Sequence, residues 1–280
     1  MPTNHKPERE QAPCPLVTVV MSVYNSADTV GRAVSAILNQ SYPNTEFIIC
    51  DDASTDGTWE KLEPWAADRR VRLLRNARNL GPGASRNRCF ACANGQFVAL
   101  MDADDDCLPS RLSEEMAVLS GRPEIAFVGT RGEYFSESDG ALGRYYWFLS
   151  EPRSADFLMT LPFVHASLLF RREVLQRLGG YGESGTLRRA EDYDLLMRAY
   201  AAGYAGCNLP KALYRIRICQ PYHRQKYKDR VNECAVKWRG FARLGLMPRG
   251  IIYAIKPLFV DFLPVKLLNK LKERYYSRWK

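Results

Sequence analysis

Four aspartates follow an apolar run near the middle of this 280-residue chain. Residues 97–101 (FVALM) have the continuous hydrophobicity of a buried strand, and the next five residues are DADDD. Asp102 and Asp104 flank one alanine, so an extended or tightly turned backbone would direct both carboxylates toward one ion. Oxygen ligands of this kind favour Mg²⁺ or Mn²⁺, with substrate phosphates completing the coordination. The alternative is an acidic turn exposed to water.

A second pair of aspartates ends another apolar run. Asp51 and Asp52 open the sequence DDASTDG, and Tyr24 and Asn25 follow a third run, at residues 16–23. Carboxylates in such a position could accept hydrogen bonds from a ribose hydroxyl or from the N–H of a base. Asp, Ser, Thr and Gly are also turn and helix-capping residues, so part of this sequence could serve the helix that follows it.

Two further segments suit phosphate binding and acid–base chemistry. Residues 79–87 (NLGPGASRN) open a helix, where backbone amides could face an anion and Arg86 would add a fixed positive charge. The segment lacks the GxxxxGK(S/T) pattern, which excludes a P-loop. Glu191 and Asp192 begin another helix, where they either complement the helix dipole or supply a general base for an acceptor hydroxyl.

The elements that must bring these residues together are predicted by the first hundred residues. Strand and helix patterns alternate at residues 16–23, 28–39, 46–50, 58–67, 71–74, 83–93 and 96–101. This alternation predicts βαβ units and a parallel sheet covered by helices on both faces. Since ligands bind at the carboxyl ends of such strands, we expect residues 24–25, 51–57 and 102–106 to meet at one edge of the sheet.

Five motifs, taken in order, resemble one known family. They are VVMSVYN, NQSYPNTEFIICDDASTDGT, NLGPGASRN, MDADD and GGYGESGTLRRAEDYDLLMR. Their joint order, over residues 16–215, resembles the inverting, GT-A-fold glycosyltransferases of family 2. The resemblance implies an α/β, Rossmann-like fold with a mostly parallel sheet. It also implies an inverting enzyme of class EC 2.4, with a nucleotide-diphosphate sugar as donor and Mg²⁺ or Mn²⁺ bridging the donor diphosphate.

The resemblance further implies a role for each matching residue. The residues that would hold the nucleoside are Tyr24, Asn25, Asp51 and Asp52. Arg86 would lie near the diphosphate or the donor sugar, Asp104 would contact the metal, and Asp102 would share the metal or bind the ribose. Asp192, paired with Glu191, would be the catalytic base. An inverting transfer is a single in-line displacement, which needs a base beside the acceptor and charge stabilisation at the departing diphosphate.

The chain departs from the family pattern at one point. Family members often carry Tyr-Arg-x-His after the helix, but here residues 214–217 read YRIR, so Arg217 stands where a metal-binding His would be. Either the metal has fewer protein ligands or Arg217 contacts the diphosphate. His223 could substitute as a ligand. His165 lies in an apolar stretch and is either a core residue or a contact to the acceptor.

Charge is unevenly distributed along the chain, whose formal net charge is +9. Residues 211–280 contain 18 Lys and Arg but 4 Asp and Glu, and residues 264–280 have the pattern of an amphipathic helix. Such a segment suits an anionic membrane surface, and the alternative is a helix packed on the body with a solvated basic face. Charge alone gives little reason to expect nucleic-acid binding.

Composition completes the expected organisation. No apolar stretch reaches the ~18–20 residues that span a bilayer, and residues 1–15 lack the apolar core of a signal peptide. We expect a flexible leader at residues 1–15, a catalytic domain at 16–215 and a basic, mainly helical extension at 216–280. The enzyme would be cytoplasmic, peripheral on the cytoplasmic face of the membrane, and would act on a lipid-linked glycan precursor of the cell surface.

Two rival functions would use the same residues differently. A nucleotidyltransferase would share the scaffold and the aspartates, but it usually carries a Gly-rich basic loop after the first strand, where this chain reads YNSAD. A non-catalytic sugar-nucleotide-binding protein would bind the donor without transfer, and the presence of Asp102, Asp104 and Asp192 argues against it. Loops such as residues 129–153 would determine which sugar and acceptor are used.

Overall fold

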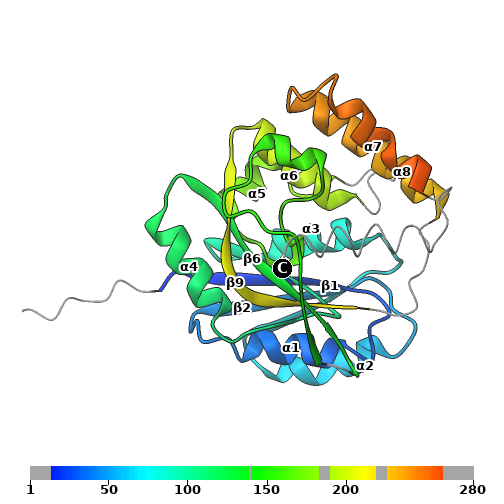
Figure 1. The fold of residues 1–280 in the computed structure, drawn as a ribbon. Coiled ribbons are helices and arrows are strands. Elements are labelled where there is room, and N and C mark those ends of the chain that lie inside the picture. Colours follow the sequence, from blue (N-terminus) through cyan, green and yellow to red (C-terminus); the bar gives the residue numbers. More distant parts are fainter. Residues whose placement is uncertain (1–13, 139, 183–189, 219–225, 261–280) are drawn as a thin grey trace, which may run out of the picture.

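The structure is a computed structural model that describes residues 14–138, 140–182, 190–218 and 226–260 (Figure 1). The first part of the chain forms β1 (Val17–Val23), α1 (Val30–Leu38), β2 (Thr45–Asp51), α2 (Thr58–Leu62), β3 (Val71–Arg75), α3 (Pro82–Cys92) and β4 (Phe97–Asp102). β1 pairs in parallel with both β2 and β4, and β2 pairs in parallel with β3. The predicted βαβ alternation is confirmed.

The second part of the chain completes a mixed sheet. Its elements are β5 (Asp106–Cys107), α4 (Arg111–Gly121), β6 (Ile125–Ser136), β7 (Gly140–Tyr145), η2 (Ser154–Leu158), η3 (His165–Ser167), β8 (Leu169–Arg171), α5 (Arg172–Leu178), α6 (Glu191–Ala201) and β9 (Ala205–Arg217). The strand order is β3-β2-β1-β4-β8-β6-β9-β5, with β7 paired to β6. β8 is antiparallel to both of its neighbours, so β6 runs in the same direction as β4. β6 pairs in parallel with β9, and the sheet is mostly parallel, as predicted.

Two local expectations were wrong. The helix predicted at 58–67 ends at Leu62 and continues as the 3₁₀-helix η1 (Glu63–Ala67), because Pro64 has no N–H to extend the α-helical bonding. Residues 129–153, expected to be loops, include most of β6 and the whole of β7. The buried start of β6 carries on into a long strand whose far end pairs with both β7 and β9.

The apolar residues of the central strands fill two cores, one on each face of the sheet. Val19 and Met21 belong to one core and Val20 to the other, as the alternation of side chains along a strand requires. Helices α1 and α4 contribute to the first core, and α3, α5 and α6 to the second. Both cores stabilise the strands at whose carboxyl ends the polar loops lie.

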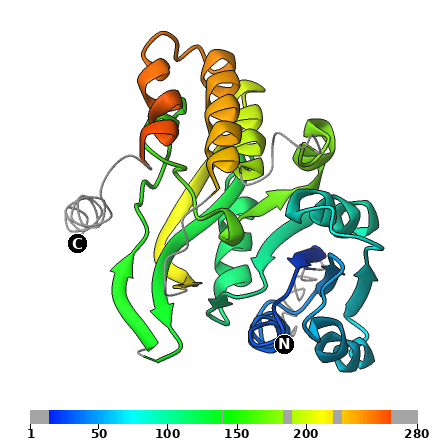
Figure 2. The same ribbon diagram turned by 90° about the vertical axis from the view of Figure 1, so that its right-hand side faces the viewer.

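Two further helices, α7 (Tyr227–Arg243) and α8 (Gly250–Val260), stand side by side at one end of the molecule (Figure 2). α7 packs closely on α6 at Gly240. The Met197 side chain of α6 lies so near this glycine that a Cβ there would collide with it. Within the described part of the chain, no helix combines the length and the apolar character needed to cross a bilayer. The amphipathic helix predicted at 264–280, and His223, lie outside the described residues.

Candidate functional site

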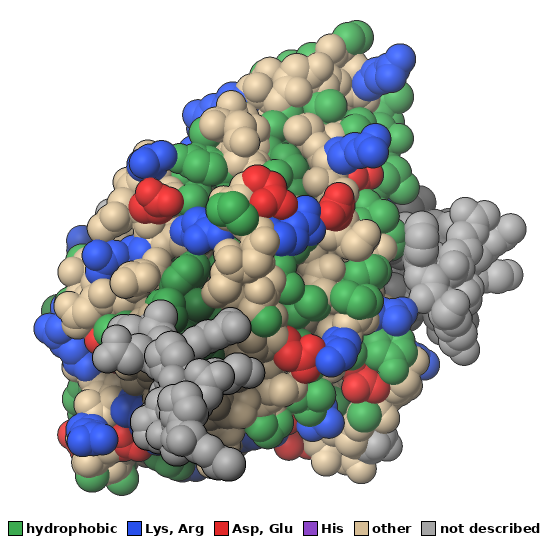
Figure 3. Space-filling view, turned by 90° about the vertical axis from the view of Figure 1, so that its left-hand side faces the viewer, with side chains coloured by type: hydrophobic (Ala, Val, Ile, Leu, Met, Phe, Trp, Pro, Cys, Tyr) green, Lys and Arg blue, Asp and Glu red, His purple; other side chains and the backbone are tan. Residues whose placement is uncertain are grey.

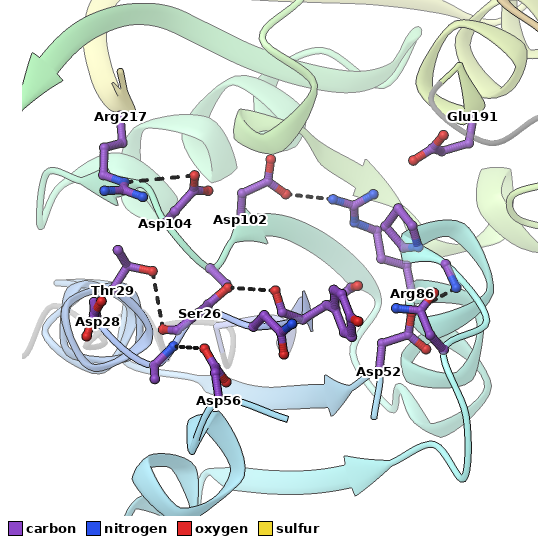
Figure 4. Close-up of a pocket in the computed structure, with 18 residues that line it drawn as sticks. Ser26, Asp28, Thr29, Asp52, Asp56, Arg86, Asp102, Asp104, Glu191 and Arg217 are labelled. Carbon is purple, nitrogen blue, oxygen red and sulfur yellow. Dashed lines mark hydrogen bonds and ion pairs between the residues drawn. The ribbon is translucent and has the colours of Figure 1, made fainter. Parts of the chain in front are cut away.

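A cavity of about 650 Å³ opens at the carboxyl ends of β1, β2 and β4. In the parallel register Val23 lies opposite Asp51, and Ser22 lies opposite Asp102, so the loops after these strands leave the sheet at the same level. The predicted meeting of the polar loops is confirmed. The sequence-predicted residues that line the cavity are Tyr24, Asn25, Asp52, Arg86, Asp102, Asp104, Glu191 and Arg217 (Figure 4).

The four aspartates after β4 divide into two pairs. Asp102 and Asp104 line the cavity, with 37% and 44% of their side-chain surface exposed. Asp105 is buried and accepts a hydrogen bond from the Arg217 backbone N–H at 2.8 Å, and Asp106 lies 3.3 Å from an Arg215 guanidinium nitrogen. Asp105 and Asp106 therefore fasten the acidic loop to β9, while the other two face the cavity.

The two carboxylates in the cavity have different cationic partners. Asp102 Oδ1 accepts a 2.6 Å hydrogen bond from Arg86 Nη2, whereas Asp104 Oδ2 lies 3.9 Å from Arg217 Nε. Desolvation and the charge of Asp102 raise the pKa of Asp104, and the Arg217 charge opposes this only in part. The Arg217 charge therefore does not fully offset the burial of Asp104 and its closeness to Asp102. The backbone carbonyl of Asp104 accepts a hydrogen bond from Arg32, a residue that the sequence patterns did not single out.

Arg86 is held by the groups behind it. Its guanidinium carbon lies 5.6 Å from the centre of the Tyr181 ring, and the Tyr181 hydroxyl is 2.7 Å from His165 Nε2. Burial and the Arg86 charge set the pKa of His165 well below its ordinary value, so the imidazole is neutral. His165 is not among the residues that line the cavity, so its place is behind Arg86, and the structure does not bring it to an acceptor position. Arg86 Nε is buried and has no hydrogen-bond partner among the described residues.

The two aspartates after β2 lie differently from what the sequence suggested. Asp51 is fully buried, accepts a hydrogen bond from the Ser54 backbone N–H, and does not line the cavity. Asp52 reaches the cavity, but its oxygens accept N–H bonds from Leu80 and Gly81, each at 2.8 Å, and from the Asn76 side chain. The expectation that the amides of the Gly-rich segment face a bound anion is therefore wrong for these two, because Asp52 already occupies them.

The loop after β1 is fastened to the loop after β2. The Asn25 backbone N–H donates to Ser54 Oγ at 3.0 Å, and Asn25 Oδ1 accepts the Thr55 N–H at 2.9 Å. Asn25 and Ala53 adopt positive φ angles of 48° and 61°, a conformation that non-glycine residues hold only when the surroundings fix it. Tyr24 stays half exposed at the rim. Asp28 and Asp56 also line the cavity; Asp56 lies within DDASTDG, which could have indicated it.

The first turn of α6 closes the opposite side of the cavity. Glu191 points into it (Figure 4), and Glu191 Oε2 is buried without a hydrogen-bond partner among the described residues. Asp192, the next residue, is half-buried and is not part of the lining. Burial and then the charge of Glu191 raise the pKa of Asp192 to about 7. One half of the predicted acidic pair therefore faces the cavity, and the other titrates near neutral pH beside it.

Comparison with known proteins gives this arrangement a family. The sequence profile described as Glycosyl transferase family 2 matches residues 18–179, more than half of the chain. The chain belongs to glycosyltransferase family 2. Its relative EpsE of Bacillus subtilis (strain 168), a glycosyltransferase by name, is 33% identical over 263 residues, which cover 93% of this chain and 94% of EpsE.

Two further proteins are similar to this chain, one in sequence and one in fold. Escherichia coli WfaP, named a UDP-Glc:alpha-D-GlcNAc-diphosphoundecaprenol beta-1,3-glucosyltransferase, is 28% identical and matches 72% of this chain and 77% of its own. The mannosyltransferase PcManGT of Pyrobaculum calidifontis, solved with GDP-Man and Mn²⁺, superposes with a TM-score of 0.61 at 21% identity, covering 100% of this chain and 86% of that one. At that identity the second likeness concerns the fold, which is the mixed α/β fold of the GT-A glycosyltransferases.

Proposed function

We propose that this glycosyltransferase transfers one sugar, with inversion, from a nucleotide-diphosphate sugar to a hydroxyl of a lipid-linked glycan precursor. The observation that carries the proposal is the cavity itself. On one side it has the cationic side chains of Arg86 and Arg217 with the Asp102 and Asp104 carboxylates, and on the other it has Glu191 from α6. A donor diphosphate and an attacking acceptor need these two sides to face each other across the reacting carbon.

The donor would lie along the loops after β1 and β4. Tyr24 and Asn25 would form the wall against the nucleoside, with Asp52 at its base. Arg86 has an unpartnered, buried N–H beside Asp102 and is suited to a phosphate oxygen, since guanidinium groups bind phosphates with charge-assisted hydrogen bonds. Arg217 would take a second phosphate oxygen. Of the two alternatives for Arg217, a contact to the diphosphate is preferred because Arg217 lines the cavity close to Asp104.

Asp102 and Asp104 are the residues that would hold a divalent metal. Their exposed carboxylates and the raised pKa of Asp104, caused by desolvation and by Asp102, fit a hard cation that takes oxygen ligands. The described ranges contain no group of three His, Cys, Asp or Glu side chains placed to hold a metal, so substrate and water would supply the other ligands. When bound, Mg²⁺ or Mn²⁺ would stabilise the charge on the departing diphosphate.

Asp192 is the proposed general base. It would take the proton of the acceptor hydroxyl as the oxygen attacks the anomeric carbon, while the bond from that carbon to the diphosphate breaks and its electron pair leaves with the diphosphate. A carboxylate with a pKa of about 7 accepts a proton more strongly than an ordinary Asp and is still half ionised at neutral pH. The Asp192→Asn variant should lower kcat by about 10²- to 10⁴-fold. Near-normal turnover with an intact fold would contradict this role.

Two observations support a lipid-linked acceptor: the name of a relative and the charge of the C-terminal residues. WfaP, by its name, acts on a sugar joined to undecaprenol through a diphosphate, and this chain has an excess of basic residues in its last 70 residues that suits such an anionic substrate. We place the catalytic region at residues 16–215 and the acceptor-side, basic region at 216–280. The enzyme would work from the cytoplasmic face of the membrane.

Helices α7 and α8 would provide the contact with that membrane. Each leaves apolar side chains exposed one or two turns apart: Tyr227, Val231 and Trp238 on α7, and Ile252 and Phe259 on α8. Figure 3 shows basic and apolar side chains mixed on one face of the molecule. α7 and α8 also carry exposed basic side chains, among them Lys228 and Lys256, beside these apolar ones, a combination suited to anionic lipid. Ile252→Glu should weaken co-sedimentation with phosphatidylglycerol vesicles, and Met159→Glu, at an exposed apolar residue directly after η2, should not. Equal binding by both variants would contradict the proposal.

Thermal unfolding with a panel of nucleotide diphosphates and nucleotide sugars, with and without Mn²⁺, tests the proposed function. A ligand at 100 times its Kd should add ~2.7 kcal/mol of stability. We expect one nucleotide series to raise the melting temperature in a metal-dependent way. A chain that responds to none of them, and transfers no sugar, would not have the proposed donor site.

A further inference from the structure

A second, cationic cavity lies beside the start of α6. It has a volume of about 280 Å³ and is lined by Gly180 and Gly182, by Asp194 and Arg198 of α6, and by Arg239 and Arg243 of α7. It shares no lining residue with the donor cavity. Arg239 and Arg243 are one helical turn apart, so they project from the same face of α7 toward α6.

The arginines of this second cavity are not balanced by carboxylates. Arg198 is fully engaged: Nε donates to Asp194 Oδ2, and its two terminal nitrogens donate to the carbonyls of Leu178 and Gly180, each at 2.7 Å. Arg243 is half exposed and lies 3.6 Å from the other oxygen of the same carboxylate. Arg239 has no ion pair within the described part of the chain. Among the described residues of the lining, three guanidinium groups thus surround one carboxylate, a surplus of two positive charges.

Helix α6 connects the second cavity with the proposed base, because it carries residues of both. Asp194 and Arg198 follow Glu191 on α6 by three and seven residues, which is ~4.5 and ~10.5 Å along the axis at 1.5 Å per residue. At about 100° per residue, Asp194 and Arg198 lie within about 60° of Glu191 around α6, so a group bound at Arg239 and Arg243 would lie on the same side of α6 as Glu191 and within about two helical turns of it along the axis. An acceptor whose sugar hydroxyl reaches Asp192 would carry its own anionic linkage into this cavity.

We propose that Arg239 and Arg243 form the binding site for the diphosphate of a prenyl-diphosphate-linked acceptor. This rests on the proposed function for the identity of the acceptor, but the site itself is defined by its charge. Guanidinium groups match the oxygens of a diphosphate in geometry and charge. Arg198, locked by Asp194 and two carbonyls, fixes the α6 side of the cavity, while the two α7 arginines keep donors free for the ligand.

Calorimetric titration of the full-length protein with geranyl diphosphate tests this site directly. EDTA should be present, so that no metal recruits the probe to Asp102 and Asp104. The double variant Arg239→Gln/Arg243→Gln should bind the probe roughly tenfold or more weakly, because it loses two charge-assisted contacts. The matched variant Lys228→Gln/Lys256→Gln removes the same charge from exposed positions of α7 and α8 and should bind like the native chain. Arg217→Gln, in the donor cavity, should also leave this affinity unchanged.

Three results would overturn the proposal: no binding of geranyl diphosphate to the native chain, equal binding by the double variant, or equal weakening in the lysine variant. Phosphatidylglycerol vesicles without diphosphate separate a lipid headgroup from the proposed ligand. The arginine variant should bind such vesicles no worse than the lysine variant does, and a loss confined to vesicles would assign these arginines to the membrane surface instead. Donor binding, followed by melting temperature with nucleotides, tests the proposed function independently, because the titration requires neither donor nor transfer.

Discussion

Two pairs of aspartates end neighbouring parts of the same sheet and have opposite surroundings. Asp51 is the last residue of β2 and Asp52 follows it; Asp102 is the last residue of β4, on the other side of β1, and Asp104 lies two residues further on. The first pair is buried, and its oxygens accept hydrogen bonds from the backbone and from Asn76, with the Arg75 guanidinium 3.3 Å from Asp51. The second pair is partly exposed to the cavity and has one guanidinium near each carboxylate.

This difference shows what separates a structural carboxylate from one available to a ligand. Backbone N–H groups around Asp52 satisfy its lone pairs and fix the Gly-rich segment that opens α3. Asp104 receives no comparable set of donors, and desolvation together with the nearby Asp102 charge raises its pKa. A carboxylate in the first situation builds the loop, whereas one in the second gains by binding a cation.

The largest effect should come from the pair after β4. Asp104→Asn should reduce transfer by about 10³-fold, because a metal contributes several kcal/mol of charge stabilisation, and it should abolish the Mn²⁺-dependent rise in melting temperature with donor. Stability without ligand should not fall, since the raised pKa means that folding disfavours the ionised carboxylate. The control is Asp106→Asn, in the same loop but paired with Arg215. Equal losses in both variants would remove the distinction between the two halves of this loop.

The pair after β2 should show the reverse, a loss of stability. Asp52→Ala leaves the Leu80 and Gly81 N–H groups and the Asn76 amide without their acceptor, so we expect the free energy of unfolding to fall by about 2–4 kcal/mol. Chemical denaturation measures this. Asp28→Ala, at an exposed position of the same cavity, should stay within ~0.5 kcal/mol of the native chain. An unchanged midpoint for Asp52→Ala would show that its hydrogen bonds are dispensable.

The smallest effect concerns the acidic pair of α6. Its surroundings are intermediate between those of the two aspartate pairs, since Glu191 faces the cavity and Asp192 does not. kcat should rise with pH through about 7 as Asp192 ionises, and Glu191→Gln should move this midpoint to lower pH, because the Glu191 charge raises the pKa of Asp192 after burial does. The sign for stability is opposite: a raised carboxyl pKa makes the native fold less stable as pH rises from the ordinary Asp value to about 7. Glu173→Gln, at an exposed site on α5, should leave the kinetic midpoint in place. A titration that persists in Asp192→Asn would belong to another group.

Hydrophobic pattern alone predicted the first seven elements, six of them with bounds within about two residues, and the edge at which their loops meet; the helix at 58–67 ended early, at Leu62. The reason is that β1, β2 and β4 are buried on both faces, which leaves continuous apolar runs in the sequence. The antiparallel strand β8 and the β6–β7 pairing were not predictable in this way. Three-residue strands such as β8 carry too little pattern, and their pairing depends on partners about 40 to 70 residues away.

The residue types of the site were therefore determined by the sequence, since only carboxylates, guanidinium groups and a polar loop after each strand suit a charged donor. Tertiary structure decided which of them remain available. Asp51 is buried, and Asp52 accepts hydrogen bonds from two backbone amides. Of the four aspartates at the end of β4, two face the cavity and two contact β9. Glu191, not Asp192, lines the cavity. The physical reason is that a carboxylate's role depends on which donors and charges lie within a few ångströms of it, and those neighbours come from elsewhere in the chain.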